Sequence, residues 1–208
     1  SAHRREYFQS VRQTSIDTQA FIDELTATAH WDDTLFIILG DHGEGLNDHP
    51  RVWQSNSHGK LLYGSHVYVP MLWYHPSGSI TPGRVHQPSR LLDVAPTLLD
   101  YLGVDPLPPT AGRSLLPLLQ GDYSEVLVPE FIVSETYSQS FDKIACFSTA
   151  WQFLHHRDFH AGCREFELQR NGAYVNGKHT DHSEQHPDIA ARMARYIEQW
   201  EAEHPKTE

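Results

Sequence analysis

The sequence is short of cationic residues. Lys and Arg number 16 against 27 Asp and Glu, so the formal net charge at pH 7 is −11. Nucleic-acid backbones and anionic membranes are poor default partners for a chain of this charge. We therefore predict no nucleic-acid partner, and an anionic substrate would need a local positive centre such as a metal ion or a few placed cations.

Long hydrophobic segments are also missing. The longest apolar runs, such as Leu35–Leu39, are far shorter than the roughly 20 residues of a membrane-spanning helix. Residues 1–30 contain no apolar core of a signal peptide. We predict no membrane span within this chain.

Cysteine is scarce, and several catalytic signatures are absent. Cys146 and Cys163 are the only two cysteines, too few for a disulfide framework and at no zinc-site spacing; one disulfide and two free thiols both stay open. The sequence has no Gly-x-Ser-x-Gly and no glycine-rich phosphate loop. A nucleophile-elbow hydrolase and a nucleotide-binding loop are therefore not indicated.

The residues that are present describe a globular α/β chain. Apolar residues make up 39% of 208 positions, with five Trp, nine Tyr and nine Phe to build a core. Apolar periodicity predicts a helix over 4–29, and the continuous run at 34–39 predicts a buried, parallel strand. Further predicted elements are a strand at 67–74, a helix at 91–102, short strands at 130–135, 143–148, 151–155 and 164–168, and an amphipathic helix from Pro187 onward.

This order of elements predicts two parts. Residues 1–121 form an α/β unit with a predominantly parallel sheet, and residues 122–208 form a small α+β subdomain. The second part combines a short antiparallel sheet with the terminal helix. The boundary is placed where Gly121-Asp122 follows a proline-rich connection.

The most informative polar cluster directly follows the first predicted strand. Asp41 and His42 stand between glycines at a strand end, the place where open α/β sheets bind ligands. A carboxylate and an imidazole are both ligands of divalent metals. The pair therefore predicts a metal site, against the alternative of a strand-end cap beside an exposed histidine.

A second cluster lies on a glycine-containing loop. His58 and Lys60 are suited to protonating a leaving group and binding an oxyanion, or they are a solvated loop. Glu44 is a candidate acceptor for orienting His42, or an ordinary surface carboxylate. The histidines of the C-terminal part match no zinc-site spacing, and we interpret them as non-ligands, as we do Asp48-His49. The C-terminal histidines are His155, His156, His160, His179, His182 and His186.

Taken in order, these segments resemble the C-terminal half of a sulfatase, within the alkaline phosphatase superfamily. The matching blocks are residues 31–44 (Trp-Asp-Asp to Asp-His-Gly-Glu), 58–63 (His-Gly-Lys-Leu-Leu-Tyr), 69–71, 91–103 and 112–119. The resemblance implies an alkaline-phosphatase-like α/β sandwich. It also implies that Asp41 and His42 complete a metal site, and that His58 or Lys60 contacts the transferred group or protonates the leaving oxygen.

The family's nucleophile motif, Cys/Ser-x-Pro-x-Arg, is absent from this chain. Cys146 precedes Phe-Ser-Thr and Cys163 precedes Arg-Glu-Phe, so neither fits it. We therefore expect a fragment that is inert alone, belonging to a sulfuric ester hydrolase whose N-terminal half completes the site. The metal would be Ca²⁺ or Mg²⁺ in a sulfatase.

Two alternatives remain. The first is a phosphoethanolamine or phosphoglycerol transferase, or a phosphate or phosphonate monoester hydrolase, with Zn²⁺ or Mn²⁺. The second is a non-catalytic metal- or ligand-binding domain. The expected substrate is a small-molecule or glycan sulfate ester, or a phosphate ester. An extracytoplasmic location is favoured over the cytoplasm, as in many family members.

Overall fold

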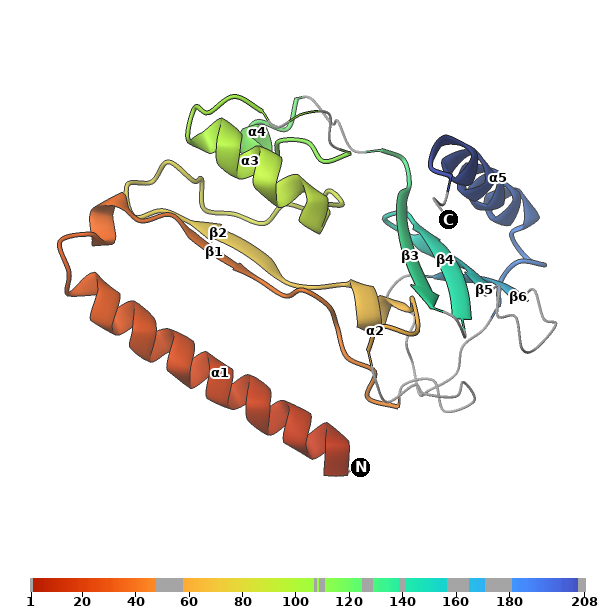
Figure 1. Cartoon of the computed structure of the whole chain (residues 1–208), viewed down its shortest axis with the longest axis horizontal. Coiled ribbons are helices and arrows are strands. Elements are labelled where there is room, and N and C mark those ends of the chain that lie inside the picture. The colour runs from red at the N-terminus through yellow and green to blue at the C-terminus, as the bar shows by residue number, and fades with distance from the viewer. Residues whose placement is uncertain are drawn as a thin grey trace.

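A computed structural model describes residues 2–47, 58–106, 108, 111–124, 129–138, 141–156, 165–170 and 181–205. They form a mixed α/β structure with two separate sheets (Figure 1). The elements in chain order are α1 (Ala2–Thr26), η1 (Trp31–Asp33), β1 (Phe36–Leu39), α2 (Gly64–Val67), β2 (Met71–Tyr74), η2 (Leu91–Asp93), α3 (Val94–Tyr101), α4 (Leu116–Leu119), β3 (Ile132–Ser138), β4 (Phe141–Phe147), β5 (Trp151–His156), β6 (Glu165–Arg170) and α5 (Pro187–Glu203).

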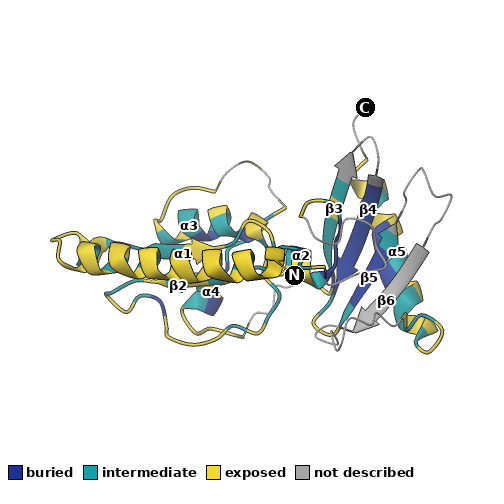
Figure 2. Cartoon of the chain, turned by 90° about the horizontal axis from the view of Figure 1, so that it is seen from below, coloured by how far each residue is buried: buried dark blue, intermediate teal, exposed yellow. Residues whose placement is uncertain are grey.

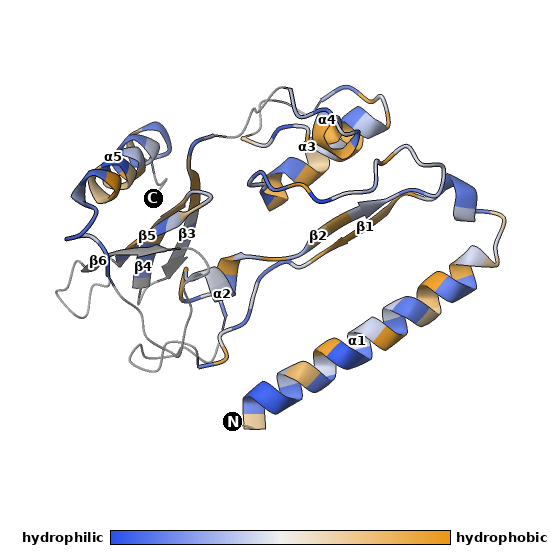
Figure 3. Cartoon of the chain, turned by 180° about the vertical axis from the view of Figure 1, so that it is seen from behind, coloured by the Kyte–Doolittle hydropathy of each residue, from blue (hydrophilic) through white to orange (hydrophobic). Residues whose placement is uncertain are grey.

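The first helix confirms the expectation for residues 4–29 but buries none of its side chains. Pairs one turn apart, such as Gln13 with Asp17 at 2.8 Å, support its polar side. Its apolar residues remain exposed, among them Phe8 at 54% and Phe21 at 58%. α1 is therefore almost entirely exposed along its length (Figure 2), although orange apolar positions recur along it (Figure 3).

The two strands of the first sheet are antiparallel, so the expectation of parallel strands is wrong for this pair. Phe36 pairs with Tyr74 and Leu39 with Met71. The reason is the connection: the chain leaves β1 and returns to the same end, where Gly40 N–H donates to the carbonyl of Pro70 at 3.1 Å. β1 is also not fully buried, because Ile38 is 42% exposed.

A buried carboxylate organises the segment from η2 to α4. Asp93 is fully buried. It accepts Arg90 Nη2 at 2.7 Å on one oxygen and Arg90 N–H at 2.9 Å on the other. Arg113 N–H donates to Asp93 at 3.1 Å, and Leu115 N–H donates to Thr97 Oγ1 at 2.9 Å. These bonds tie the chain after α3 back to the start of that helix.

The second sheet is antiparallel in the order β3-β4-β5-β6, as expected for the C-terminal part. Alternate residues of β4 face opposite sides, which is the ordinary period of a strand. Ile144 and Cys146 belong to a core with Met193 and Ile197 of α5, so the terminal helix covers one face, as expected.

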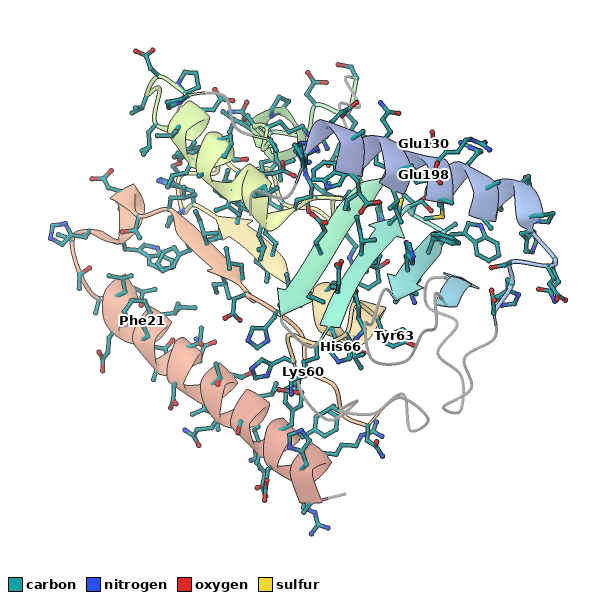
Figure 4. The ribbon with its side chains drawn as sticks, turned by 45° about the vertical axis from the view of Figure 1, so that its right-hand side comes forward. Phe21, Lys60, Tyr63, His66, Glu130 and Glu198 are labelled. Atoms are coloured by element: carbon teal, nitrogen blue, oxygen red, sulfur yellow. The ribbon has the colours of Figure 1, made fainter. Side chains whose placement is uncertain are left out.

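The other face of this sheet packs on the loop that follows the Asp41-His42 pair. Ala145 and Phe147 share a core with Leu61, Leu62 and Tyr63. Residues far apart in sequence are thereby packed together. Tyr63 and His66 lie at α2, with ring centroids 6.4 Å apart (Figure 4). The division of the chain at residue 121 stays a prediction. No helix in the described part is long and apolar enough to cross a membrane.

Candidate metal and ester-binding site

The site begins where β1 ends. Asp41 and His42 follow Gly40. The N–H of Gly40 donates a hydrogen bond to the carbonyl of Pro70, which directly precedes β2. A Cβ on Gly40 would lie 3.2 Å from that of Val69, so the two segments run closely together here. The strand pair therefore fixes the point at which Asp41 and His42 leave the sheet.

Gly43 sets the direction of the loop that follows. Its N–H donates to the carbonyl of His66 at 2.8 Å. A Cβ at this position would lie 2.0 Å from the carbonyl oxygen of Ser65, which no side chain tolerates. The glycine after His42 is therefore required by the close approach of two backbones.

His42 is held by acceptors of its own loop. Its Nδ1 lies 2.8 Å from the carbonyl oxygen of Gly43, and its backbone N–H donates to Asp41 Oδ1 at 2.9 Å. Because a carbonyl only accepts, Nδ1 carries the proton, which leaves the Nε2 lone pair of the neutral ring free. That Nε2 lies 3.7 Å from Asp41 Oδ2.

Asp41 and His42 fit a divalent metal as two of its ligands. The carboxylate oxygen and the free imidazole nitrogen are 3.7 Å apart, a separation that two bonds of about 2.0–2.2 Å to one ion can span. A carbonyl holding the other nitrogen of a histidine ligand is the usual outer-shell arrangement. Within the described residues no group of three or more His, Cys, Asp or Glu assembles, so this part of the chain offers two ligands only.

Glu44 holds His58, which differs from the expectation that it orients His42. Glu44 Oε2 lies 3.0 Å from His58 Nδ1, with the Glu44 side chain only 17% exposed. Its Oε1 accepts Gly45 N–H at 3.1 Å. The rings of His42 and His58 stack with centroids 4.2 Å apart. The structure thus places the His58 ring directly against the ring of His42.

A cavity of about 620 Å³ opens beside the pair. Asp41 and His42 line one part of it, and the β3 residues Glu135 and Thr136 line another. Thr136 Oγ1 also donates to the carbonyl of Gly59 at 2.7 Å, which ties the His58-Gly59-Lys60 turn to the second sheet. Sequence reasoning missed these β3 residues, because they lie far from the loop in sequence and carry no motif.

Lys60 stands in the sequence between Gly59 and Leu61, which both line this cavity, but it is not itself a lining residue. Lys60 is partly buried. The cavity is therefore bounded by Gly59 and Leu61 of the turn, on either side of Lys60. The role of Lys60 stays a prediction.

The other histidines and the cysteines are not assembled into a second site by the described residues. His182 and His186 pack on Trp151, with ring centroids 5.8 and 4.8 Å from it. Cys146 is a buried free thiol. Several positions lie outside the described residues, namely Asp48, His49, His160, Cys163 and His179, as does the side chain of His156.

Comparison with known proteins gives one consistent family. The sulfatase family model matches residues 2–104. The choline-sulfatase of Rhizobium meliloti is 31% identical over 139 residues, which are 65% of this chain and 26% of that protein. The multifunctional alkaline phosphatase superfamily protein PehA of Trinickia caryophylli is 36% identical over 102 residues, 48% of this chain and 18% of that protein.

The fold agrees with this family. A solved sulfatase structure from Bacteroides thetaiotaomicron superposes with a TM-score of 0.77 at 20% identity, covering 91% of this chain and 40% of that one. This chain thus spans about a quarter of the length of the choline-sulfatase and about two fifths of the solved sulfatase. The sequence match over residues 2–104 and the alkaline-phosphatase-like fold together make this chain a member of the sulfatase family.

Proposed function

We propose that this chain supplies part of the active site of a metal-dependent sulfuric ester hydrolase. The observation that carries the proposal is the convergence at the end of β1. Asp41 Oδ2 and His42 Nε2 are 3.7 Å apart, and the His58 ring stacks on His42 beside a cavity of about 620 Å³. In this proposal Asp41 and His42 hold the metal, His58 serves the leaving group, and Lys60 binds the sulfuryl oxygens.

The ligand pair supports a divalent cation. A cation held by Asp41 and His42 would stabilise negative charge on the sulfuryl group and polarise it for attack. Carboxylate oxygen suits Ca²⁺ and Mg²⁺, which we favour for a sulfatase, whereas imidazole also suits Zn²⁺ and Mn²⁺. The cation would also offset the chain's net charge of −11, which otherwise opposes binding of an anionic ester.

The other two side chains have distinct tasks. When the sulfur–oxygen bond breaks, its electrons stay on the leaving oxygen, and His58 Nε2–H donates a proton to that oxygen. The Lys60 ammonium would bind the sulfuryl oxygens as charge builds on them. Neither His58 nor Lys60 is among the residues that line the cavity. The ester would have to reach His58 from its open side, where the side chain is 55% exposed, and Lys60 would need a change of side-chain direction.

The remaining parts of the site would come from the N-terminal half of the whole enzyme. The sequence has no Cys/Ser-x-Pro-x-Arg motif, and the described residues hold no group of three or more potential metal ligands. The exposed apolar residues of α1 and of the β1–β2 sheet, such as Phe21 and Leu72 at 58% and 54%, support further packing partners. We therefore propose that these 208 residues alone do not turn over substrate.

A phosphate or phosphonate ester is the second candidate substrate, and it rests on one observation. PehA, a multifunctional alkaline phosphatase superfamily protein, has the higher identity of the two relatives described above. Asp41, His42 and His58 would serve phosphoryl transfer in the same roles. An upstream Thr nucleophile in place of the Cys/Ser-x-Pro-x-Arg motif would favour this alternative.

Paired assays on the whole enzyme test the proposal. With 4-nitrophenyl sulfate and 4-nitrophenyl phosphate as parallel substrates, we expect metal-dependent sulfate release to exceed phosphate release. Preferred phosphate release would move the assignment to the second candidate. Stoichiometric metal binding with neither activity would favour a non-catalytic binding domain. We keep the expectation of an extracytoplasmic location, which fractionation of the source cells tests.

A further inference from the structure

Glu44 is one residue beyond the Asp-His-Gly turn, and its two oxygens have different partners. Oε1 accepts the N–H of Gly45 at 3.1 Å, and Oε2 lies 3.0 Å from Nδ1 of His58. The Glu44 side chain is 17% exposed and the His58 side chain 55%. The carboxylate is thus the anchored member of the pair, and the histidine is the member open to a ligand.

We infer that Glu44 is a positioning residue that fixes the tautomer and the ring direction of His58. This inference rests on the proposed function, in which His58 protonates the leaving oxygen. A carboxylate only accepts, so Nδ1 of His58 must carry its proton toward Glu44. The Nε2 atom is then the one presented to substrate.

The same loop fixes both stacked rings in the same way. His42 Nδ1 faces the carbonyl of Gly43, and His58 Nδ1 faces the carboxylate of the next residue, Glu44. The ring planes are inclined by only 21°, with centroids 4.2 Å apart. Each imidazole therefore has its Nε2 free of the loop, one for the metal and the other for the ester.

The proton transfer balances without a further reactant. Nδ1 of His58 keeps its proton and donates to Glu44 throughout the step, so the proton that is transferred is a second one, carried on Nε2. As the sulfur–oxygen bond breaks, the Nε2 proton passes to the leaving oxygen, which becomes an alcohol. His58 is left neutral, and its Nδ1–H still donates to Glu44.

The variant E44Q gives the sharpest test because it keeps the shape of the side chain. The oxygen of the introduced amide would stay with Gly45 N–H, so the amide NH₂ would face His58 Nδ1. A donor at that position requires Nδ1 to be unprotonated, so the neutral ring must move its proton to Nε2. In triads the corresponding Asp-to-Asn change acts through such a wrong tautomer.

Nitrogen NMR of the ¹⁵N-histidine-labelled 208-residue chain reads the tautomer directly, with His58→Gln assigning the signal. We expect the neutral His58 ring to be protonated on Nδ1 in the wild type and on Nε2 in E44Q, while the neutral His42 ring keeps its Nδ1 proton in both and so reports an intact loop. The exposed-site control E198Q should match the wild type. The same His58 tautomer in wild type and E44Q would overturn the inference.

Leaving-group dependence in the whole enzyme separates positioning from simple structural support. E44Q should lower kcat for an alkyl sulfate by up to the roughly 10²- to 10⁴-fold that a positioned general acid contributes. With 4-nitrophenyl sulfate, whose leaving group needs no proton, kcat should be nearly unchanged. An equal loss for both substrates would overturn the positioning role. Absence of any ester hydrolysis by the wild type would instead overturn the proposed function, and the tautomer result would still stand.

Discussion

The imidazole rings of His42 and His58 are stacked, with centroids 4.2 Å apart and planes inclined by 21°. The two residues are separated by 16 positions and belong to different segments, the loop after β1 and the turn tied to β3 through Gly59. Their Nδ1 atoms are held by Gly43 and Glu44. The chain therefore holds the two imidazole rings side by side, which is the arrangement that the proposed metal role of His42 and the proposed acid role of His58 require.

Loss of either proposed metal ligand should weaken metal binding. In the whole enzyme we expect D41N and H42A each to lower the affinity for Mn²⁺ or Ca²⁺ by more than the roughly 10- to 100-fold that loss of an outer-shell partner costs. Isothermal titration after chelator treatment measures this. H75A, which changes a partly buried turn histidine bonded to Ser77 and distant in sequence from the pair, is the control. Unchanged affinity in D41N would contradict the assignment.

Replacing Gly43 should disturb the site and the fold together. A Cβ in G43A would lie 2.0 Å from the Ser65 carbonyl oxygen, and such overpacking costs about 1–3 kcal/mol of unfolding free energy. Urea denaturation measures the loss. G83A is the matched control, because nothing lies within 4 Å of a Cβ there. Equal stability of G43A and G83A would refute the close approach.

The Asp93 carboxylate should be a main support of the segment from η2 to α4. Removing it in D93A leaves the Arg90 guanidinium without its 2.7 Å partner and Arg113 N–H without an acceptor. Loss of one member of a buried pair costs about 3–5 kcal/mol. D32A, at an exposed position, should cost little under the same denaturation. A D93A loss as small as that of D32A would count against the network.

Cys146 should be unreactive in the folded chain. Burial raises the pKa of its thiol from 9.0 to about 12, so the reactive thiolate is scarce at pH 8.5. In a C163S background, iodoacetamide should modify Cys146 slowly without urea and rapidly with it. The same pKa shift makes the free energy of unfolding depend on pH. Between pH 9 and about 12 only the unfolded thiol ionises, so the Cys146 contribution destabilises the fold as pH rises through that range. Rapid alkylation without urea would contradict this burial.

Local pattern was sufficient to predict the long helices and the strand that precedes the Asp41-His42 pair. Asp41 and His42 follow a strand, as the run Leu35–Leu39 indicates, and the stripe that contains Met193 and Ile197 packs on the second sheet. The strand pairing was not predictable in the same way. An apolar run favours a buried strand whatever its neighbour, and only the return of the chain at Pro70 makes the pair antiparallel.

The partners within the site depended on contacts distant in sequence. Glu44 reaches His58 across 14 positions, and Thr136 reaches Gly59 across 77. No periodicity links such residues. For Glu44 the expected partner was His42, which is only two positions away in sequence. The core that Leu61 to Tyr63 share with Ala145 and Phe147 is equally non-local. Sequence therefore indicated the candidate site residues, whereas the fold determined which of them meet.

Release of sulfate by the whole enzyme, measured beside the isolated 208-residue chain, tests the central claim most directly. The account predicts sulfate release that requires a divalent metal, is abolished by D41N and is absent from the isolated chain. Turnover by the isolated chain would contradict it. So would sulfate release by the whole enzyme that persists in D41N or survives removal of the metal.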